Sequence, residues 1–170
     1  MLFRSYFDWR LMLGRQPQKF PGTAPVHHFY GLAEAIRMLD EEGLENVFAR
    51  HHRLADATRA AVRVWGEEGS MELFCQNEKL YSDSVTAILM RPGIDAEKVR
   101  QAALDHYNVS LGGGLDNLKG KVFRIGHMGD LSPLQLMGVL AGVEMGLRVA
   151  GVPHKSGGTQ AALEYLSGNK

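Results

Sequence analysis

The sequence predicts an α/β protein in which a small, mostly antiparallel sheet is covered by helices and preceded by a long linking helix. Apolar residues recur at helical spacing from residue 26 to residue 65, and shorter apolar runs typical of strands follow from residue 71. The predicted order is helix, helix, strand, strand, helix, strand, strand, helix. No glycine fingerprint opens a strand–helix–strand repeat, which favours an antiparallel or mixed sheet.

The helical half begins after a segment rich in proline. Residues 16–25 contain three prolines, which exclude a helix there and favour an extended chain. Thr23 or Pro25 is expected to open a first helix, which pauses at Gly43. A second helix is predicted over Leu44–Trp65, and the glycine that follows it is a typical end signal.

The second half is predicted to alternate strands and helices. Strands are expected over residues 71–75, 84–90, 109–111 and 121–127. Asp95 is a candidate N-cap for a helix that reaches Tyr107, and Ser132 with a following proline opens another that reaches Ala150. A short helical run is expected near the end, over residues 160–166.

Charge and hydropathy exclude several classes of function. The 170 residues carry 19 Lys and Arg against 19 Asp and Glu, so no net charge points to nucleic acid or to an anionic membrane surface. No apolar stretch is long enough to span a bilayer, and residues 1–15 lack the features of a secretory signal. We therefore expect a cytoplasmic protein with no membrane or nucleic-acid partner.

Three side-chain groups are assigned structural roles. The single cysteine, Cys75, excludes an internal disulfide, and a buried structural thiol is favoured over a nucleophile. The seven histidines show no metal-ligand spacing, so no metal is expected. The arginines between Arg50 and Arg63 are interleaved with acids and alanines, which indicates a solvated helix face.

Arg124 is the residue whose setting is most informative about function. It lies inside an apolar strand run, between Phe123 and Ile125. Burying a guanidinium is costly unless an anion meets it, and the guanidinium matches a carboxylate with two parallel hydrogen bonds. The strand pattern leaves open a socket for a substrate carboxylate, an internal ion pair, or an arginine at a strand end whose charge reaches solvent.

The glycine run Gly112–Gly114 has two interpretations. A phosphate-binding loop would need a preceding strand and a helix directly after it. Leu115 and Asp116 follow instead, and another strand comes soon after. A plain loop that interrupts the strand pattern is therefore favoured.

Several stretches, taken together and in order, resemble class V aminotransferases of the serine–glyoxylate and alanine–glyoxylate type. The resemblance covers nearly the whole chain, and the ordered set is more specific than any single stretch. The stretches that carry it are Tyr30–Leu32, Glu42–His51, Arg53–Ala55, Val85–Ala87, Leu111–Leu115, Gly120–Gly129, Gly142–Leu147 and Ala150–His154.

The resemblance implies the C-terminal part of a fold-type I transferase that uses pyridoxal 5′-phosphate (PLP). Residues 1–25 would end the large PLP domain and form the active-site linker, 26–66 would be long linking helices, and 67–170 the small C-terminal domain. It also implies a homodimer that acts on small amino acids and glyoxylate.

The resemblance assigns roles to three residues. Arg124 falls on the family arginine that holds the substrate α-carboxylate. Thr23 falls on the threonine that reaches the PLP phosphate of the other subunit, and Phe20 on a neighbouring aromatic position of the cofactor site. Gly22 stands where serine–glyoxylate members often carry tyrosine, which weakens the phosphate-side assignment.

The resemblance also implies that the lysine which binds the cofactor lies upstream of Met1. No lysine of this sequence stands in a matching segment, so no catalytic residue is assigned and the 170-residue chain alone is expected to be inactive. In the family this lysine forms the Schiff base and shuttles a proton, without which the reaction has no start. A truncated gene, a misplaced start codon or a fragment would account for the beginning at Met1.

The expected activity of the complete protein is transfer of an amino group from serine or alanine to glyoxylate. Ureidoglycine is a further possible donor, and the tail of the chain weakly favours serine. The alternative is a non-catalytic dimerisation module, or one half of a split aminotransferase. A class V cysteine desulfurase is a weaker alternative, because Cys75 is poorly placed for a mobile catalytic cysteine.

Overall fold

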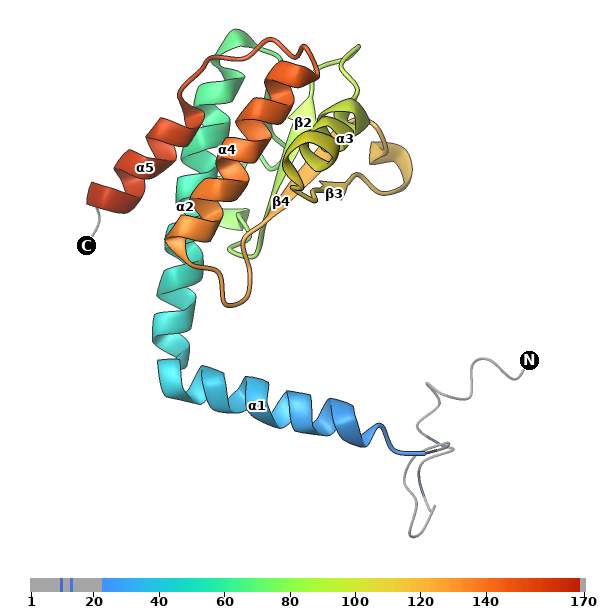
Figure 1. Cartoon of the computed structure of the whole chain (residues 1–170), viewed down its shortest axis with the longest axis vertical. Helices are drawn as coiled ribbons and strands as arrows, with labels where there is room; N and C mark the ends of the chain where they lie inside the picture. The colour runs from blue at the N-terminus through green and yellow to red at the C-terminus, as the bar shows by residue number, and fades with distance from the viewer. Residues whose placement is uncertain (1–9, 11–12, 14–22, 169–170) are drawn as a thin grey trace. The chain divides into compact units, whose positions relative to one another are not determined.

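The computed structural model describes residues 10, 13 and 23–168 (Figure 1). The chain divides into two compact units, Met1–Leu44 and Glu45–Lys170. Each unit is described below by itself.

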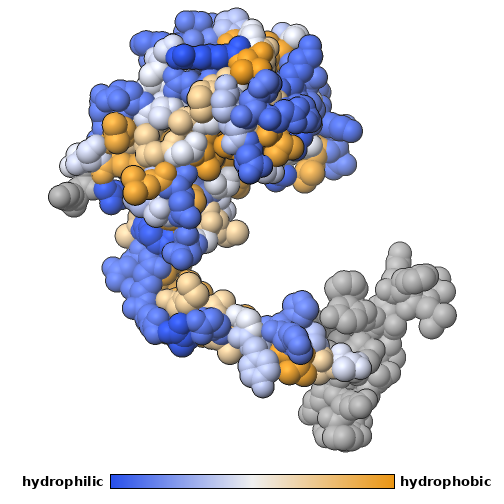
Figure 2. All heavy atoms as spheres, in the orientation of Figure 1, coloured by the Kyte–Doolittle hydropathy of each residue, from blue (hydrophilic) through white to orange (hydrophobic). Residues whose placement is uncertain are grey.

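The described part of the first unit is a helix and its entry. Helix α1 spans Val26–Glu42, so the predicted start just after Pro25 is confirmed. Its end is set by Gly43, whose backbone has φ 80° and donates to the carbonyl of Leu39. None of the α1 residues is buried, and apolar atoms face solvent along this helix (Figure 2). The exposed apolar side chains are Val26, Phe29, Tyr30, Leu32, Ile36, Met38 and Leu39.

Helix α2 spans Leu44–Trp65, as predicted from its apolar spacing. One face of this helix enters the core of the second unit, with Leu54, Ala61 and Trp65 among its buried residues. A 3-10 turn, η3, follows over Gly66–Glu68. A Cβ at Gly66 would lie 2.6 Å from the carbonyl oxygen of Met71. This position therefore has no room for a side chain, because the first strand begins so close to it.

The second unit is built on a four-stranded antiparallel sheet. Strands β1 (Met71–Leu73), β2 (Val85–Met90), β3 (Gly112–Gly113) and β4 (Val122–Gly126) are arranged in the order β1-β2-β4-β3 (Figure 1). The predicted fold class, a small antiparallel sheet covered by helices, is confirmed. The 3-10 turns η4 (Glu78–Leu80) and η5 (Asp116–Leu118) lie in its connections.

The position of the third strand was predicted wrongly. The apolar run 109–111 was expected to form the strand and the glycines to interrupt it. Instead Gly112 and Gly113 pair with Arg124 and Phe123 of β4. The hydrogen bonds of a strand pair join backbone groups, so glycines can form a strand where a neighbouring strand is there to pair with them.

Three helices complete the unit, and their starts follow the predicted caps. Helix α3 spans Ala96–Tyr107, and the Asp95 side chain accepts from the Glu97 amide. Helix α4 spans Pro133–Val149 and starts with a capping box between Ser132 and Gln135. Helix α5 spans Gly158–Gly168 and is longer than predicted.

The carboxylate of Glu144 in α4 fixes the start of α5. It accepts hydrogen bonds from the amides of Gly157 and Thr159, at 2.8 and 2.9 Å, and from the Thr159 hydroxyl at 2.7 Å. Burial raises the pKa of Glu144, but these hydrogen bonds outweigh it and lower that pKa to about 2. The buried carboxylate therefore stays charged and replaces the missing acceptors of the helix end.

The core lies between one face of the sheet and the helices. Ile88 of β2 and Phe123 and Ile125 of β4 are fully buried there, against α2, α3 and α4. The opposite face of β2 carries Val85, Ala87 and Leu89, which are only half-buried. None of the helices in the described part of the chain is long and apolar enough to cross a membrane.

Candidate carboxylate-binding site

Arg124 lies in the middle of β4, on the sheet face that the helices leave half-buried. In the sheet register its neighbours are Ala87 on β2 and Gly112 on β3. Its Nε–H donates to the carbonyl oxygen of Gly113 at 2.9 Å. Within the described residues, the two terminal nitrogens of Arg124 have no hydrogen-bond or ion-pair partner.

The internal ion pair that the strand pattern left open is therefore absent for Arg124 among the described residues. A half-buried guanidinium with two free terminal nitrogens is positioned to accept an external anion. Its cross-strand neighbours Ala87 and Gly112 are small and carry no charge.

Two adjacent glycines set the space around this arginine. A Cβ at Gly112 would lie 3.2 Å from both Cβ and Nε of Arg124. A Cβ at Gly113 would instead meet Arg100 and Glu97 of α3, at 3.0 and 3.2 Å. Successive residues of a strand point to opposite faces, so the glycine pair separates Arg124 on one side from the Arg100–Glu97 ion pair on the other.

The chain that leaves β4 is held by two histidines. His127 is fully buried: its Nδ1 lies 3.0 Å from the carbonyl of Asp83, and its Nε2 lies 2.9 Å from the Thr86 hydroxyl. His51 of α2 accepts from the amide of Gly129 at 3.0 Å, where the glycine has φ 94°. These contacts fix the end of the strand that carries Arg124.

Burial lowers the pKa of His127 to about 4, although its hydrogen bond to the Asp83 carbonyl acts in the opposite direction. The ring is therefore neutral near pH 7. A neutral ring that donates from Nδ1 to a carbonyl has an acceptor at Nε2, which matches the Thr86 hydroxyl as donor.

The predicted solvated face of α2 is wrong for Arg59, which is 3% exposed. Its guanidinium pairs with Asp56 at 2.6 Å and Asp83 at 3.3 Å and donates to the Ser82 carbonyl at 3.1 Å. It also lies 4.9 Å from the centre of the Tyr81 ring. Burial raises the pKa of Asp56, but hydrogen bonds from Arg59 and Tyr165 outweigh it and lower that pKa.

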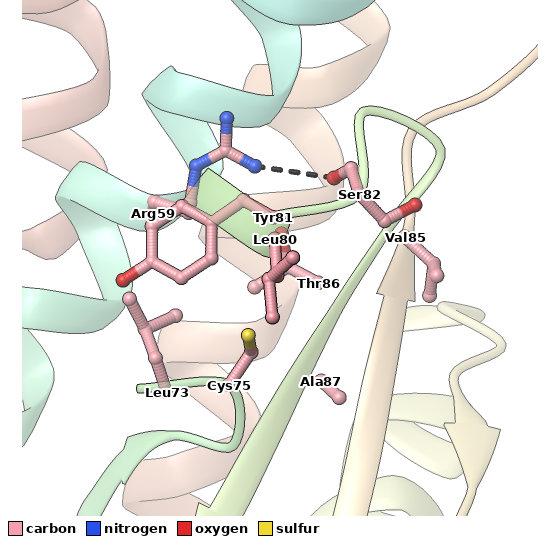
Figure 3. A pocket seen from close by; sticks show the side chains of 9 residues that line it. All are labelled: Arg59, Leu73, Cys75, Leu80, Tyr81, Ser82, Val85, Thr86 and Ala87. Carbon is pink, nitrogen blue, oxygen red and sulfur yellow. Dashed lines mark hydrogen bonds between the residues drawn. The ribbon is translucent and has the colours of Figure 1, made fainter. Parts of the chain in front are cut away.

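A cavity of about 170 Å³ lies beside β2, between that strand and the loop that precedes it (Figure 3). Arg59 forms one side, Cys75 points into it, and Ala87 separates it from Arg124 on the next strand. Its polar groups are already engaged, because Arg59 is fully paired and Thr86 bonds to His127. The remaining lining is mainly apolar: Leu73, Leu80, Tyr81 and Val85, with Ser82 at the rim.

The other residues singled out from the sequence are not brought to this site by any contact among the described residues. Cys75 is half-exposed, not buried as predicted, because it lies beyond the end of β1, and its thiol donates to the Asn77 carbonyl. Thr23 is exposed and belongs to the first compact unit, whereas Arg124 belongs to the second. Phe20 lies outside the described residues. In the described part of the chain, no group of three His, Cys, Asp or Glu side chains is placed to hold a metal ion.

Residues 4–122 match the family model for aminotransferase class-V. The chain belongs to this family. It is 47% identical to the serine–glyoxylate aminotransferase of Methylorubrum extorquens, over 99% of this chain and 41% of the relative. It is 44% identical to the serine–glyoxylate aminotransferase of Arabidopsis thaliana, over 96% of this chain and 40% of that protein.

A solved aminotransferase structure has a similar fold over most of this chain. The pyridoxamine–pyruvate aminotransferase of Mesorhizobium loti matches with a TM-score of 0.81 and 31% identity, over 91% of this chain and 39% of that one. The chain thus spans about two fifths of the length of the relatives that it matches.

The glycines beside Arg124 are the part of the site that sequence reasoning missed. The available signal was a glycine run eleven residues before a strand arginine, at a distance that suits an antiparallel neighbour. Without the register, the same run is equally typical of a loop.

Proposed function

We propose that the chain forms the C-terminal part of a PLP-dependent aminotransferase that transfers an amino group from serine or alanine to glyoxylate. In this proposal Arg124 binds the substrate carboxylate. Serine, alanine and glyoxylate each carry one carboxylate, so a single socket serves both the donor and the acceptor. The observation that supports this role most strongly is the half-buried guanidinium of Arg124, with its two terminal nitrogens free among the described residues.

The described residues do not form a PLP site by themselves. The five described lysines, at positions 79, 98, 119, 121 and 155, are all exposed, whereas a lysine that binds the cofactor needs an enclosed site. PLP, when bound, supplies the electron sink of the reaction. In this proposal the described residues bind and orient the substrate carboxylate, and they take no part in the chemistry at the cofactor.

In the complete protein, the proposal assigns the cofactor phosphate to Thr23 and its aromatic neighbour to Phe20, across the interface of a homodimer. This part rests on the resemblance of the sequence to the family. Thr23 is exposed, just ahead of α1, and lies in no helix or strand. An exposed threonine is compatible with such a contact.

The test of the carboxylate site is Arg124→Ala in the intact protein, with Arg100→Ala as the matched control. Arg100 is an arginine on the opposite side of β3 whose Nε donates to the Leu111 carbonyl and which pairs with Glu97. Arg124→Ala removes two charged hydrogen bonds and should raise KM for serine and for glyoxylate about a hundredfold. Unchanged KM values for both substrates would exclude this role of Arg124.

A second test concerns the 170-residue chain alone. Mixed with PLP, serine and glyoxylate, it is expected to form no hydroxypyruvate above the rate of a blank with PLP and no protein. Turnover above that blank would contradict the proposal that the lysine lies outside these residues. The two tests are independent, because the first measures binding in the intact protein and the second locates the catalytic group.

A further inference from the structure

The hydrogen bond from Nε of Arg124 limits how a carboxylate can approach the guanidinium. An arginine offers a carboxylate either its Nε with one terminal nitrogen or its two terminal nitrogens. The Gly113 carbonyl already occupies Nε, at 2.9 Å. The end-on approach, to Nη1 and Nη2, gives a carboxylate two parallel hydrogen bonds without displacing the Gly113 carbonyl from Nε.

The end-on arrangement depends on the missing side chain at Gly112. Gly112 lies directly opposite Arg124 in the sheet, on the same face. Opposite side chains in an antiparallel pair normally place their Cβ atoms about 4.5–5.5 Å apart. A Cβ at Gly112 would lie 3.2 Å from Cβ of Arg124, 3.2 Å from Nε and 3.5 Å from Cζ.

Arg124 cannot move away from such a side chain without losing a contact. Its Cβ is fixed by the backbone of β4, which is paired on both edges, with β2 and with β3. Its Nε is held by the Gly113 carbonyl. A side chain at position 112 would therefore turn the guanidinium away from β3 and break the bond at Nε.

We propose that Gly112 is a positioning residue for the substrate carboxylate: its lack of a side chain lets Arg124 lie across β3, where the Gly113 carbonyl holds Nε and aims Nη1 and Nη2 at the carboxylate. This inference rests on the proposed function of Arg124. It adds a positioning residue and the end-on geometry to that site.

Gly138 provides a control outside the site. It lies on α4, and a Cβ there would meet no other atom of the described residues within 4 Å. Gly138→Ala thus adds the same methyl group as Gly112→Ala, without touching Arg124 or the carbonyl that holds it. An effect seen only in Gly112→Ala belongs to the space beside the arginine.

The experiment compares Gly112→Ala and Gly138→Ala in the intact protein. Gly112→Ala should raise KM for serine and for glyoxylate about tenfold, as expected for one misplaced charged contact, and leave kcat within about threefold. It should weaken competitive inhibition by propionate, an unreactive carboxylate, by the same factor. Gly138→Ala should leave these values within about twofold of the parent protein.

A second measurement is independent of activity and of the amount of folded enzyme. The ¹⁵N–¹H resonance of the Arg124 Nε group, assigned by its loss in Arg124→Ala, should shift and exchange faster with water in Gly112→Ala. In Gly138→Ala it should stay unchanged.

The outcomes separate the inference from the proposed function. If Arg124→Ala raises KM but Gly112→Ala does not, and the Nε resonance stays in place, the positioning role is wrong and the carboxylate site stands. If Arg124→Ala itself leaves KM unchanged, the proposed function fails first. Equal rises in Gly112→Ala and Gly138→Ala would also overturn the positioning role, because the effect would then not depend on the space beside Arg124.

Discussion

Arg59 and Arg124 are two arginines of the same folded unit with opposite surroundings. Arg59 is almost fully buried, and its guanidinium has two carboxylates, a carbonyl and an aromatic ring as partners. Arg124 is half-buried, and among residues 10, 13 and 23–168 its guanidinium has one hydrogen bond, from Nε to the Gly113 carbonyl. Removing a buried charge that has its partners inside the fold is costly to stability. A guanidinium whose terminal nitrogens lack partners is available to a ligand.

The largest expected effect on stability comes from replacing Arg59, the arginine whose charge is paired inside the fold. Arg59→Ala removes a buried guanidinium with its charged hydrogen bonds and its contact with the Tyr81 ring, while Asp56 and Asp83 remain partly exposed to water. It should lower the free energy of unfolding by about 2–4 kcal/mol. Urea denaturation at pH 7.5 measures it. Arg63→Ala is the control on the same helix, because its ion pair with Glu78 is exposed and contributes about 0–1 kcal/mol. A loss below that of Arg63→Ala would show that Arg59 is not the stabilising arginine.

The second prediction concerns acid and the buried histidine next to the strand of Arg124. Because the pKa of His127 is lowered to about 4 in the folded state, the unfolded chain binds more protons between pH 6.5 and 4. The stability that His127 contributes is complete above pH 6.5 and falls, by roughly 3 kcal/mol in all, as the pH drops through 4.

Urea titrations at pH 7.5, 5.5 and 4.5 test this dependence on His127. The variant His127→Gln keeps a polar side chain but cannot take up a proton, so its stability should fall less over the same interval. Parallel pH curves for the parent protein and the variant would contradict the assignment.

The smallest expected effect on stability comes from replacing Arg124, the arginine with few partners among the described residues. Arg124→Ala removes a residue that makes one hydrogen bond within the described part of the chain, to a backbone carbonyl, so the free energy of unfolding should change by less than about 1 kcal/mol. The same urea titration gives this value. A loss as large as that of Arg59→Ala would mean that Arg124 is a structural residue after all.

The features predicted well from the sequence are those that neighbours along the chain determine. Asp95 and Ser132 cap α3 and α4 through amides two and three residues away, so the cap residues alone place the helix starts. The apolar spacing of α2 gives both of its ends. The strand context of Arg124 also suffices to single it out, because a guanidinium in an apolar run always raises the question of its anion.

The features missed depend on contacts between distant residues. Arg59 finds its partners Ser82 and Asp83 23 and 24 residues away, in a loop that no local pattern ties to α2. The strand at Gly112 exists because β4 pairs with it, which composition cannot indicate. The sequence singled out Arg124 as a candidate, but not the Gly113 carbonyl that holds its Nε.

Strand β3 is two residues long and lies at the edge of the sheet. An edge strand exposes unpaired amides and carbonyls to which another chain can add, and very short edges limit such growth. The strand that leaves room for Arg124 therefore also gives a foreign strand too little backbone to extend the sheet. An insertion that lengthened β3 would increase the risk of aggregation at this edge, even with Arg124 intact.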